Sequence, residues 1–276
     1  MNLRHLSLLC LGTMLLAAGE PQPWAWPKVV QIAVEEVKPG KEPAHLQNEY
    51  AWSKAYADAK SPYHFLGMIP VAGGSQAWWV WPLASYADME KLNAFTETTP
   101  GLKAKVDAFI TKDGEFISNF SVAYYNLRPD LSRGPGAIAA RYYWIFTERV
   151  RPGHEADFET LCKTMNGFYD KAGLTSRWGV YEAMAGTYNP TFLVVLPLHS
   201  LADLDAMLAD EKKFGQAAGE EGLKALSKLT ADFTGKEDSV ILAVVPKLSY
   251  PDADDLAMDP DFWKDWAPKA KKPQAK

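Results

Sequence analysis

The residues with the clearest chemical potential lie between positions 45 and 52, in the segment HLQNEYAW. His45, Asn48 and Glu49, followed by Trp52, recur at three- and four-residue spacing, so a helix would carry all four on one face. If that face is buried, its imidazole, amide and carboxylate could transfer protons or orient a ligand. We therefore predict His45, Asn48 and Glu49 as catalytic candidates and Trp52 as a substrate contact.

Two basic side chains are further catalytic candidates. His64 and Arg177 occupy corresponding predicted strands, beside the aromatic residues Phe65 and Trp178, where a cation could orient an anionic or enolic substrate. The alternative is that each is a structural residue at a strand edge. His199, in a predicted turn, is expected to be exposed.

Glu35 and Glu148 end two matching strands. In an assembly with approximate twofold symmetry these carboxylates could approach each other, and burial or mutual repulsion would raise the pKa of one into the range of a general base. The neighbouring charges of Glu36 and Arg149 favour the alternative of a solvated rim.

The stretch AWWVWPL, at residues 77–83, concentrates three tryptophans in one predicted strand. Trp79 and Trp81 should share one strand face, with Trp78 on the other. This volume could fill the space between two sheets. It could also line a pocket for a planar apolar ligand. The predicted substrate contacts are Trp52, Trp79, Trp81 and Trp144.

Composition and motifs exclude several function classes. The 276 residues are 47% hydrophobic with a formal net charge of −5, and no basic stretch is interleaved with aromatic residues, so nucleic acid is not expected as a partner. HExxH, GxSxG, paired cysteines at metal spacing and a phosphate-binding glycine loop do not occur in the sequence. We expect no metal and no cofactor.

An internal repeat organises these residues. EEVKPGKE at 35–42 matches ERVRPGHE at 148–155, and WPLASYADM at 81–89 matches LPLHSLADL at 196–204. Each copy is predicted to run strand, helix, strand, strand, helix, strand, with Ser85 and Ser200 as N-caps of the second helical region. This order is a ferredoxin-like unit. We predict an α+β protein whose two antiparallel sheets bury their uncovered faces against each other within one chain.

The repeat also bears on the first helix. Its counterpart in the second copy has Phe158, Leu161 and Cys162 on an apolar stripe, where the first copy has His45, Asn48 and Glu49. A one-residue shift of the alignment gives an alternative buried stripe, which consists of Leu46, Glu49, Tyr50 and Ser53.

The termini indicate processing and docking. Residues 1–19 have a basic start, a short apolar run and small residues before Glu20, as in a secretory signal peptide. We therefore expect a secreted or periplasmic protein that is not bound to the membrane once the signal peptide has been removed. Phe262, Trp263 and Trp266 are expected to dock on the barrel or on a neighbouring subunit. A homo-oligomer is possible, because each unit has an edge strand. The predicted division is signal peptide 1–19, first repeat 20–132, linker 133–140, second repeat 141–250 and tail 251–276.

The repeat phrases and topology resemble the dimeric α+β barrel superfamily in its tandem form, which includes NIPSNAP-like proteins, antibiotic-biosynthesis monooxygenases and the haem-binding chlorite dismutase group. The resemblance covers roughly residues 29–250 and includes no diagnostic catalytic motif. The monooxygenases imply a pocket for planar aromatic substrates, and Asn48 and Trp52 match their residue usage. Haem binding of the chlorite dismutase type would need a proximal histidine in the second unit. Only His154 and His199 occur there, both at predicted turns.

These observations lead to two function hypotheses. The first is a cofactor-free oxygenase or isomerase that acts on a small apolar or aromatic molecule. The second is a non-catalytic ligand-binding or stress-related module with a filled barrel. An enzyme should have a cavity that touches Trp79 or Trp81 and at least one of His45, Asn48, His64 and Arg177.

Overall fold

The computed structural model describes residues 25–136 and 140–266. The first repeat consists of β1 (Val29–Val37), α1 (Glu42–Asp58), β2 (Leu66–Pro70), β3 (Gln76–Leu83), α2 (Tyr86–Thr98), α3 (Leu102–Asp113) and β4 (Ile117–Leu127). The second repeat consists of β5 (Tyr142–Val150), α4 (Glu155–Lys171), β6 (Gly179–Ala185), β7 (Thr191–Leu198), α5 (Ala202–Phe233) and β8 (Thr234–Val244). A 3₁₀ turn, η1 (Pro246–Leu248), and the helices α6 (Ala253–Met258) and α7 (Pro260–Trp263) follow.

The strands form one closed antiparallel barrel in the order β1-β3-β2-β8-β5-β7-β6-β4. Each repeat has the ferredoxin-like strand order, and the edges of the two sheets join where β2 pairs with β8 and β4 pairs with β6. The predicted α+β fold with two tandem ferredoxin-like repeats is confirmed. Because those edges are paired within the chain, the edge-strand argument for a homo-oligomer is wrong, and the oligomer itself stays a prediction.

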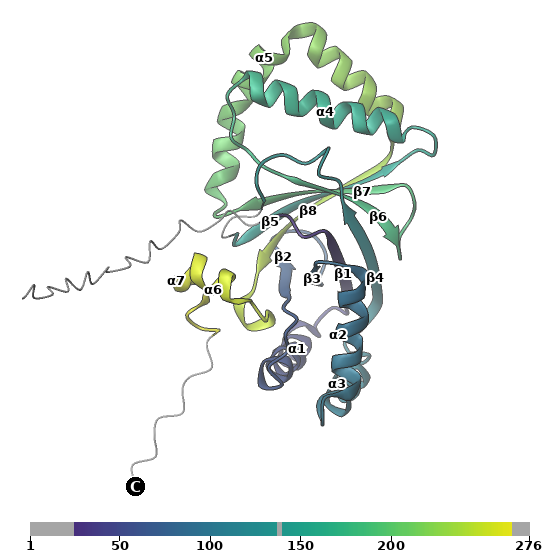
Figure 1. Cartoon of the computed structure of the whole chain (residues 1–276), viewed down its shortest axis with the longest axis vertical. Helices are drawn as coiled ribbons and strands as arrows, with labels where there is room; N and C mark the ends of the chain where they lie inside the picture. Colours follow the sequence, from purple (N-terminus) through teal and green to yellow (C-terminus); the bar gives the residue numbers. More distant parts are fainter. Residues whose placement is uncertain (1–24, 137–139, 267–276) are drawn as a thin grey trace, which may run out of the picture.

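The helices form two layers on opposite sides of the barrel (Figure 1). Helices α1, α2 and α3 cover the first repeat, whereas α4 and α5 cover the second. Alternating strand residues therefore enter two environments: one face points into the barrel and the other packs beneath helices. On β1, Val30 and Ile32 belong to the barrel core, and Val29 and Ala33 belong to the core beneath the helices.

The tryptophans of β3 follow this alternation. Trp79 and Trp81 are buried in the core beneath α1, and Trp78 packs on the barrel core. The suggestion that tryptophan fills the space between the sheets therefore holds only for Trp78. The barrel interior is nearly filled, with a residual cavity of about 80 Å³ that Tyr143 and Tyr181 help to line.

The second helical regions differ between the repeats. Ser85 caps α2 as predicted, its side chain accepting a hydrogen bond from the Asp88 backbone N–H. The prediction for Ser200 is wrong, because α5 starts at Ala202 and Leu201 is the cap residue. Both the backbone N–H and the hydroxyl of Ser200 instead bond to the Asp203 carboxylate.

The tail docks as expected. Trp263 is buried, Phe262 packs on the barrel core, and the Trp266 indole donates a hydrogen bond to the Ser249 carbonyl oxygen over 2.9 Å. An ion pair between Arg141 and Asp259 fixes the start of α7 to the barrel. The predicted signal peptide and the last ten residues lie outside the described residues, and no described helix is long and apolar enough to cross a membrane.

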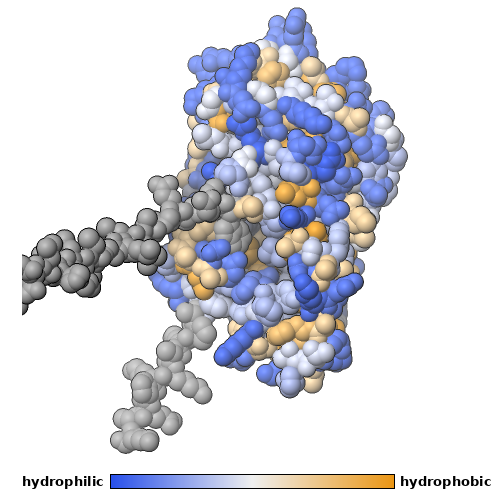
Figure 2. Space-filling model, in the orientation of Figure 1, coloured by the Kyte–Doolittle hydropathy of each residue, from blue (hydrophilic) through white to orange (hydrophobic). Residues whose placement is uncertain are grey.

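Figure 2 shows one face of the molecule, mostly hydrophilic with scattered apolar residues. The large apolar side chains exposed among the described residues include Ile110 on α3, Phe120 on β4, Met184 on β6 and Leu208 on α5.

Candidate active site

Four ionisable side chains meet in the buried space between the sheet of the first repeat and its helices. Glu35 on β1, His45 and Glu49 on α1, and Asp113 at the end of α3 are all buried, and we call them the carboxylate cluster. One potential ligand atom from each lies within 4.8 Å of those of the others. The cluster is assembled by three elements that are separated in sequence but packed together.

Local sequence explains why Glu35 faces the helices. Strand alternation puts Glu35 on the same face as Val29 and Ala33, beneath α1. Ala33 stands opposite Trp79 on β3, and Glu35 stands opposite Ala77. These small alanines leave room for the indole ring, whose Nε1 donates a 2.9 Å hydrogen bond to Glu35 Oε2.

Helix α1 supplies the imidazole. His45, Asn48 and Glu49 are buried, as the unshifted alignment predicts. Trp52, from the same predicted face, is only half-buried, and Ser53, from the shifted alternative, is buried as well. His45 Nε2 lies 3.0 Å from Glu35 Oε2 and 3.5 Å from Asp113 Oδ1. One imidazole thus faces two carboxyl groups.

Asn48 ties α1 to α3. Its Nδ2 donates to the Phe109 carbonyl oxygen over 3.1 Å and lies 3.5 Å from carboxyl oxygens of both Asp113 and Glu49. This amide orients two carboxyl groups of the cluster. It is therefore a positioning residue.

Burial dominates the electrostatics of the cluster. It raises the pKa of Glu49 well above its usual value, and the negative charges of Glu35 and Asp113 raise that pKa further. The pKa of Asp113 is also raised, first by burial and then by the charge of Glu35, with His45 opposing the shift.

An apolar cavity opens onto the cluster. This first-repeat cavity has a volume of about 290 Å³. Three carboxyl groups, those of Glu35, Glu49 and Asp113, lie in its lining. Its other side chains are Trp52, Phe109, Ile110, Ile117 and Phe120, with Gly114 completing the lining. Ile110 and Phe120 are 60% and 52% exposed, so the wall reaches the surface.

The structure brings together some of the predicted site residues and separates others. The cavity touches Glu49 and Trp52, while Trp79 and His45 support the carboxyl groups from behind. The first-repeat cavity does not touch Trp79 or Trp81, contrary to the expectation for an enzyme, because both rings are buried and pack against Trp52. Asp113 was missed, because it lies far from Glu35 and His45 in the sequence and no spacing rule connects it to them.

His64 and Arg177 lie outside this site. The His64 ring stacks on Tyr250, and its Nδ1 lies 3.0 Å from the carbonyl oxygen of Pro251. Arg177 Nη1 donates to the carbonyl oxygen of Gly136 over 3.4 Å. His199 is exposed, as expected.

The proposed approach of Glu35 and Glu148 is wrong. Three strands separate β1 from β5 in either direction around the barrel, and each carboxylate faces the helices of its own repeat. Glu148 lines a second-repeat cavity of about 290 Å³. Burial, followed by the charge of Glu237, raises its pKa to about 7.

The two cavities differ in the side chains that the covering helix supplies. Phe158, Leu161 and Cys162 take the places of the polar residues of α1. Trp144, a predicted substrate contact, lines this cavity instead of the first-repeat cavity. The two repeats thus line the same helix-over-sheet space with different side chains.

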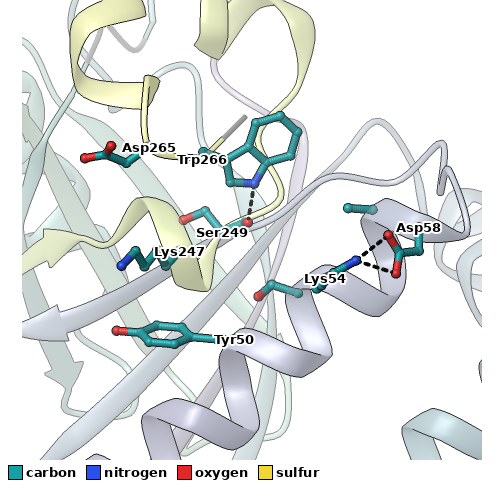
Figure 3. Close-up of a pocket in the computed structure, with 9 residues that line it drawn as sticks. Tyr50, Lys54, Asp58, Lys247, Ser249, Asp265 and Trp266 are labelled. Atoms are coloured by element: carbon teal, nitrogen blue, oxygen red, sulfur yellow. Dashed lines mark hydrogen bonds and ion pairs between the residues drawn. The ribbon is translucent and has the colours of Figure 1, made fainter. Parts of the chain in front are cut away.

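A third hollow, of about 220 Å³, lies between α1 and the tail. Figure 3 shows Tyr50, Lys54 and Asp58 on α1 opposite Lys247 and Trp266. Lys54 and Asp58 form an exposed ion pair, with both carboxylate oxygens 2.7 Å from Nζ. This hollow has a solvated polar rim and no buried ionisable group in its lining, so it is a weaker candidate than the first-repeat cavity.

Comparison with known proteins identifies the fold. No family of known sequences and no curated protein matches the chain. Among solved structures, an anthrone oxidase-like protein has a TM-score of 0.53 at 14% identity, with 79% of this chain and 92% of that chain covered. A monooxygenase candidate from Fusobacterium nucleatum has a TM-score of 0.50 at 13% identity, with coverages of 80% and 93%. The chain has the dimeric α+β barrel fold.

A chlorite dismutase variant from Candidatus Nitrospira defluvii also matches, at a TM-score of 0.46 and 9% identity over 80% of this chain and 92% of that one. The second-repeat cavity does not fit a haem held by histidine, because its described lining contains no imidazole. Cys162 is a poor substitute, since burial raises the pKa of its thiol to about 12 and disfavours the thiolate.

Proposed function

We propose that the protein is an enzyme, an oxygenase or isomerase, that acts on a small apolar or aromatic molecule in the first-repeat cavity. The observation that carries this proposal is the meeting of three buried carboxyl groups with an otherwise apolar wall. Carboxyl and imidazole groups are the side chains that most often transfer protons in enzymes. Buried clusters of this kind are typical of functional sites.

The walls indicate the substrate class. Trp52, Phe109 and Ile117 give the cavity aromatic and aliphatic surfaces, which favour a planar apolar ligand. A volume of about 290 Å³ suits a molecule of one or two rings. The names of two proteins with this fold, a monooxygenase candidate and an anthrone oxidase-like protein, support an oxidative reaction, although the fold alone does not fix function.

A binding experiment tests the cavity. The dissociation constants of a panel of one- to three-ring phenols and quinones are measured by tryptophan fluorescence with wild type, Ile110→Asp and Leu208→Asp. Ile110 and Leu208 are exposed to 60% and 63%, but only Ile110 lines the cavity. We expect Ile110→Asp to weaken binding at least tenfold, because it adds a charge beside the carboxyl groups, and Leu208→Asp to have no effect.

Turnover tests the chemistry. Ligands that bind are incubated with the protein in air, and products are followed by mass spectrometry together with oxygen uptake. Glu49→Gln should lower the rate by about 100-fold or more while it retains ligand binding. The proposal fails if no compound binds to wild type, or if Ile110→Asp binds ligands as tightly as Leu208→Asp does.

A non-catalytic binding module is the second candidate. The second-repeat cavity favours it, because Trp144, Phe146 and Phe158 could hold an apolar ligand, and the Cys162 thiol in the same lining is disfavoured as a thiolate. Ligand binding that Met165→Asp abolishes and Ile110→Asp does not would support this alternative, since Met165 lines only the second-repeat cavity.

A further inference from the structure

The carboxylate cluster has the donor atoms and the dimensions of a metal site. Its three carboxylates and one imidazole present potential ligand atoms that all lie within 4.8 Å of one another. A cation bound at about 2.0–2.2 Å from each donor allows donor separations of up to about 4.4 Å. Small side-chain rotations would therefore bring all four groups onto one ion.

An independent observation concerns Glu49. Its side chain is buried, with the residue 1% exposed, and its Oε2 has no hydrogen-bond partner among the described residues. The Glu49 carboxyl group otherwise has a long contact with Asn48, at 3.5 Å, and faces the carboxyl group of Asp113. A buried carboxyl group beside further carboxyl groups is costly unless a shared proton or a cation satisfies it.

The groups behind the cluster are those that hold metal ligands in place. Trp79 Nε1 donates to Glu35, and Asn48 Nδ2 contacts Asp113 while it is anchored on the Phe109 carbonyl oxygen. Such outer hydrogen bonds fix the orientation of ligating carboxylates. They leave Oε2 of Glu49 without a hydrogen-bond donor.

We propose that Glu35, His45, Glu49 and Asp113 bind one divalent first-row transition ion, with Mn²⁺ the closest match. Carboxylates suit Mg²⁺, Ca²⁺ and Mn²⁺, whereas an imidazole ligand favours the transition ions. The absence of sulfur from the donor set disfavours Cu⁺. A 2+ charge would also offset most of the negative charge that the three carboxylates bring into a buried space.

The cavity gives this ion an exchangeable side. Glu35, Glu49 and Asp113 line the first-repeat cavity, whereas His45 lies behind them. An ion on these groups would therefore face the apolar walls with at least one position open to water or a ligand. The metal site goes beyond the proposed function and stands whether or not the cavity turns over a substrate.

Metal binding to the purified chain tests the proposal. After chelator treatment and buffer exchange, the protein is titrated with MnCl₂ in a calorimeter, and bound metal is counted by mass spectrometry after dialysis. The variants are Glu49→Gln, Asp113→Asn and, as the matched control, Glu148→Gln. Glu148 is the half-buried carboxylate that holds the position of Glu35 in the second repeat, without such a cluster among the described residues.

We expect one Mn²⁺ per chain in wild type and in Glu148→Gln, and at least tenfold weaker binding in Glu49→Gln and Asp113→Asn. At a free Mn²⁺ concentration of 100 times the dissociation constant, Tm should rise by about 5–10 °C in wild type. Without metal, Glu49→Gln should unfold at nearly the same temperature as wild type, because glutamine has nearly the same shape as glutamate. Equal stability without metal separates a lost ligand from a damaged fold.

Sub-stoichiometric binding of Mn²⁺, Fe²⁺ and Zn²⁺ alike would overturn the proposal, as would equal affinity of wild type and Glu49→Gln. Tighter binding of Ca²⁺ than of Mn²⁺ would overturn the assignment of the ion. Metal binding without capture of any phenol or quinone would leave the metal site standing and refute the proposed function. Binding of a phenol or quinone by a protein that binds no metal would refute the metal site and leave the proposed function standing.

Discussion

Replacement of Glu148 by glutamine should make the protein less sensitive to alkaline pH. The Glu148 carboxyl group lies on β5 in the second-repeat cavity, beneath Phe158 and near Cys162, and stands opposite Glu237 on β8. Burial, with a smaller contribution from the charge of Glu237, raises its pKa from 4.5 to about 7. The glutamine side chain has nearly the same shape and cannot ionise.

The sign follows from the protons bound by each state. Between pH 4.5 and 7 the folded protein holds a proton on Glu148 that the unfolded chain has released. The stabilising contribution of Glu148 to the free energy of unfolding is thus complete below pH 4.5. It is lost as the pH rises through about 7. The shift corresponds to at most about 3 kcal/mol. Partial solvent contact of the carboxyl group reduces this to about 2 kcal/mol.

The assay is thermal unfolding, followed by circular dichroism, of wild type and Glu148→Gln at pH 5 and pH 8 in equal salt. The difference in Tm between the two proteins should change by about 4–8 °C, with wild type the less stable at pH 8. Asp255, whose pKa burial also raises to about 7, titrates in both proteins, so its effect cancels. Glu237→Gln should weaken the pH dependence slightly. A Tm difference that stays constant within about 1 °C would refute a buried, ionisable Glu148.

Two further substitutions test the packing that positions the site. Gly67→Ala should lower the free energy of unfolding by about 1–3 kcal/mol, because the new Cβ would lie 2.5 Å from the Cβ of Leu248. The control Gly74→Ala meets no atom within 4 Å and should be neutral. Equal urea midpoints of the two variants would contradict this prediction. Trp79→Phe should cost about 1–3 kcal/mol more than Trp81→Phe in urea unfolding. The reason is that Trp79 Nε1 donates to a buried carboxylate and Trp81 Nε1 has no partner; equal losses would show that this bond contributes nothing.

The fold could be predicted because the duplication leaves its mark in local signals. Pro-Gly turns, alternating strands and the phrases around Trp81 and Leu196 recur in the same order, so the strand and helix sequence could be written down twice. Each sheet has helices on one side only, and its bare apolar face requires a partner. The closure of the barrel follows from that requirement.

The candidate site was predictable only in part. His45, Asn48 and Glu49 lie on one helix, where their spacing alone predicts a shared face. The orientation of that face, over Glu35 and away from solvent, depends on α1 packing on β1 and α3. Asp113 could not be found, because its contact with His45 spans a long sequence separation and no spacing rule connects the two.

The sequence by itself determined the duplicated α+β architecture and the polar face of its first helix, since both arise from short-range periodicity. Only the tertiary structure decided that Glu35 contacts that helix instead of approaching Glu148. The barrel places β1 and β5 on opposite sides, with helices over each. It also decided which buried carboxyl oxygen is left without a partner. That property depends on every side chain packed around Glu49, and three separate elements supply them.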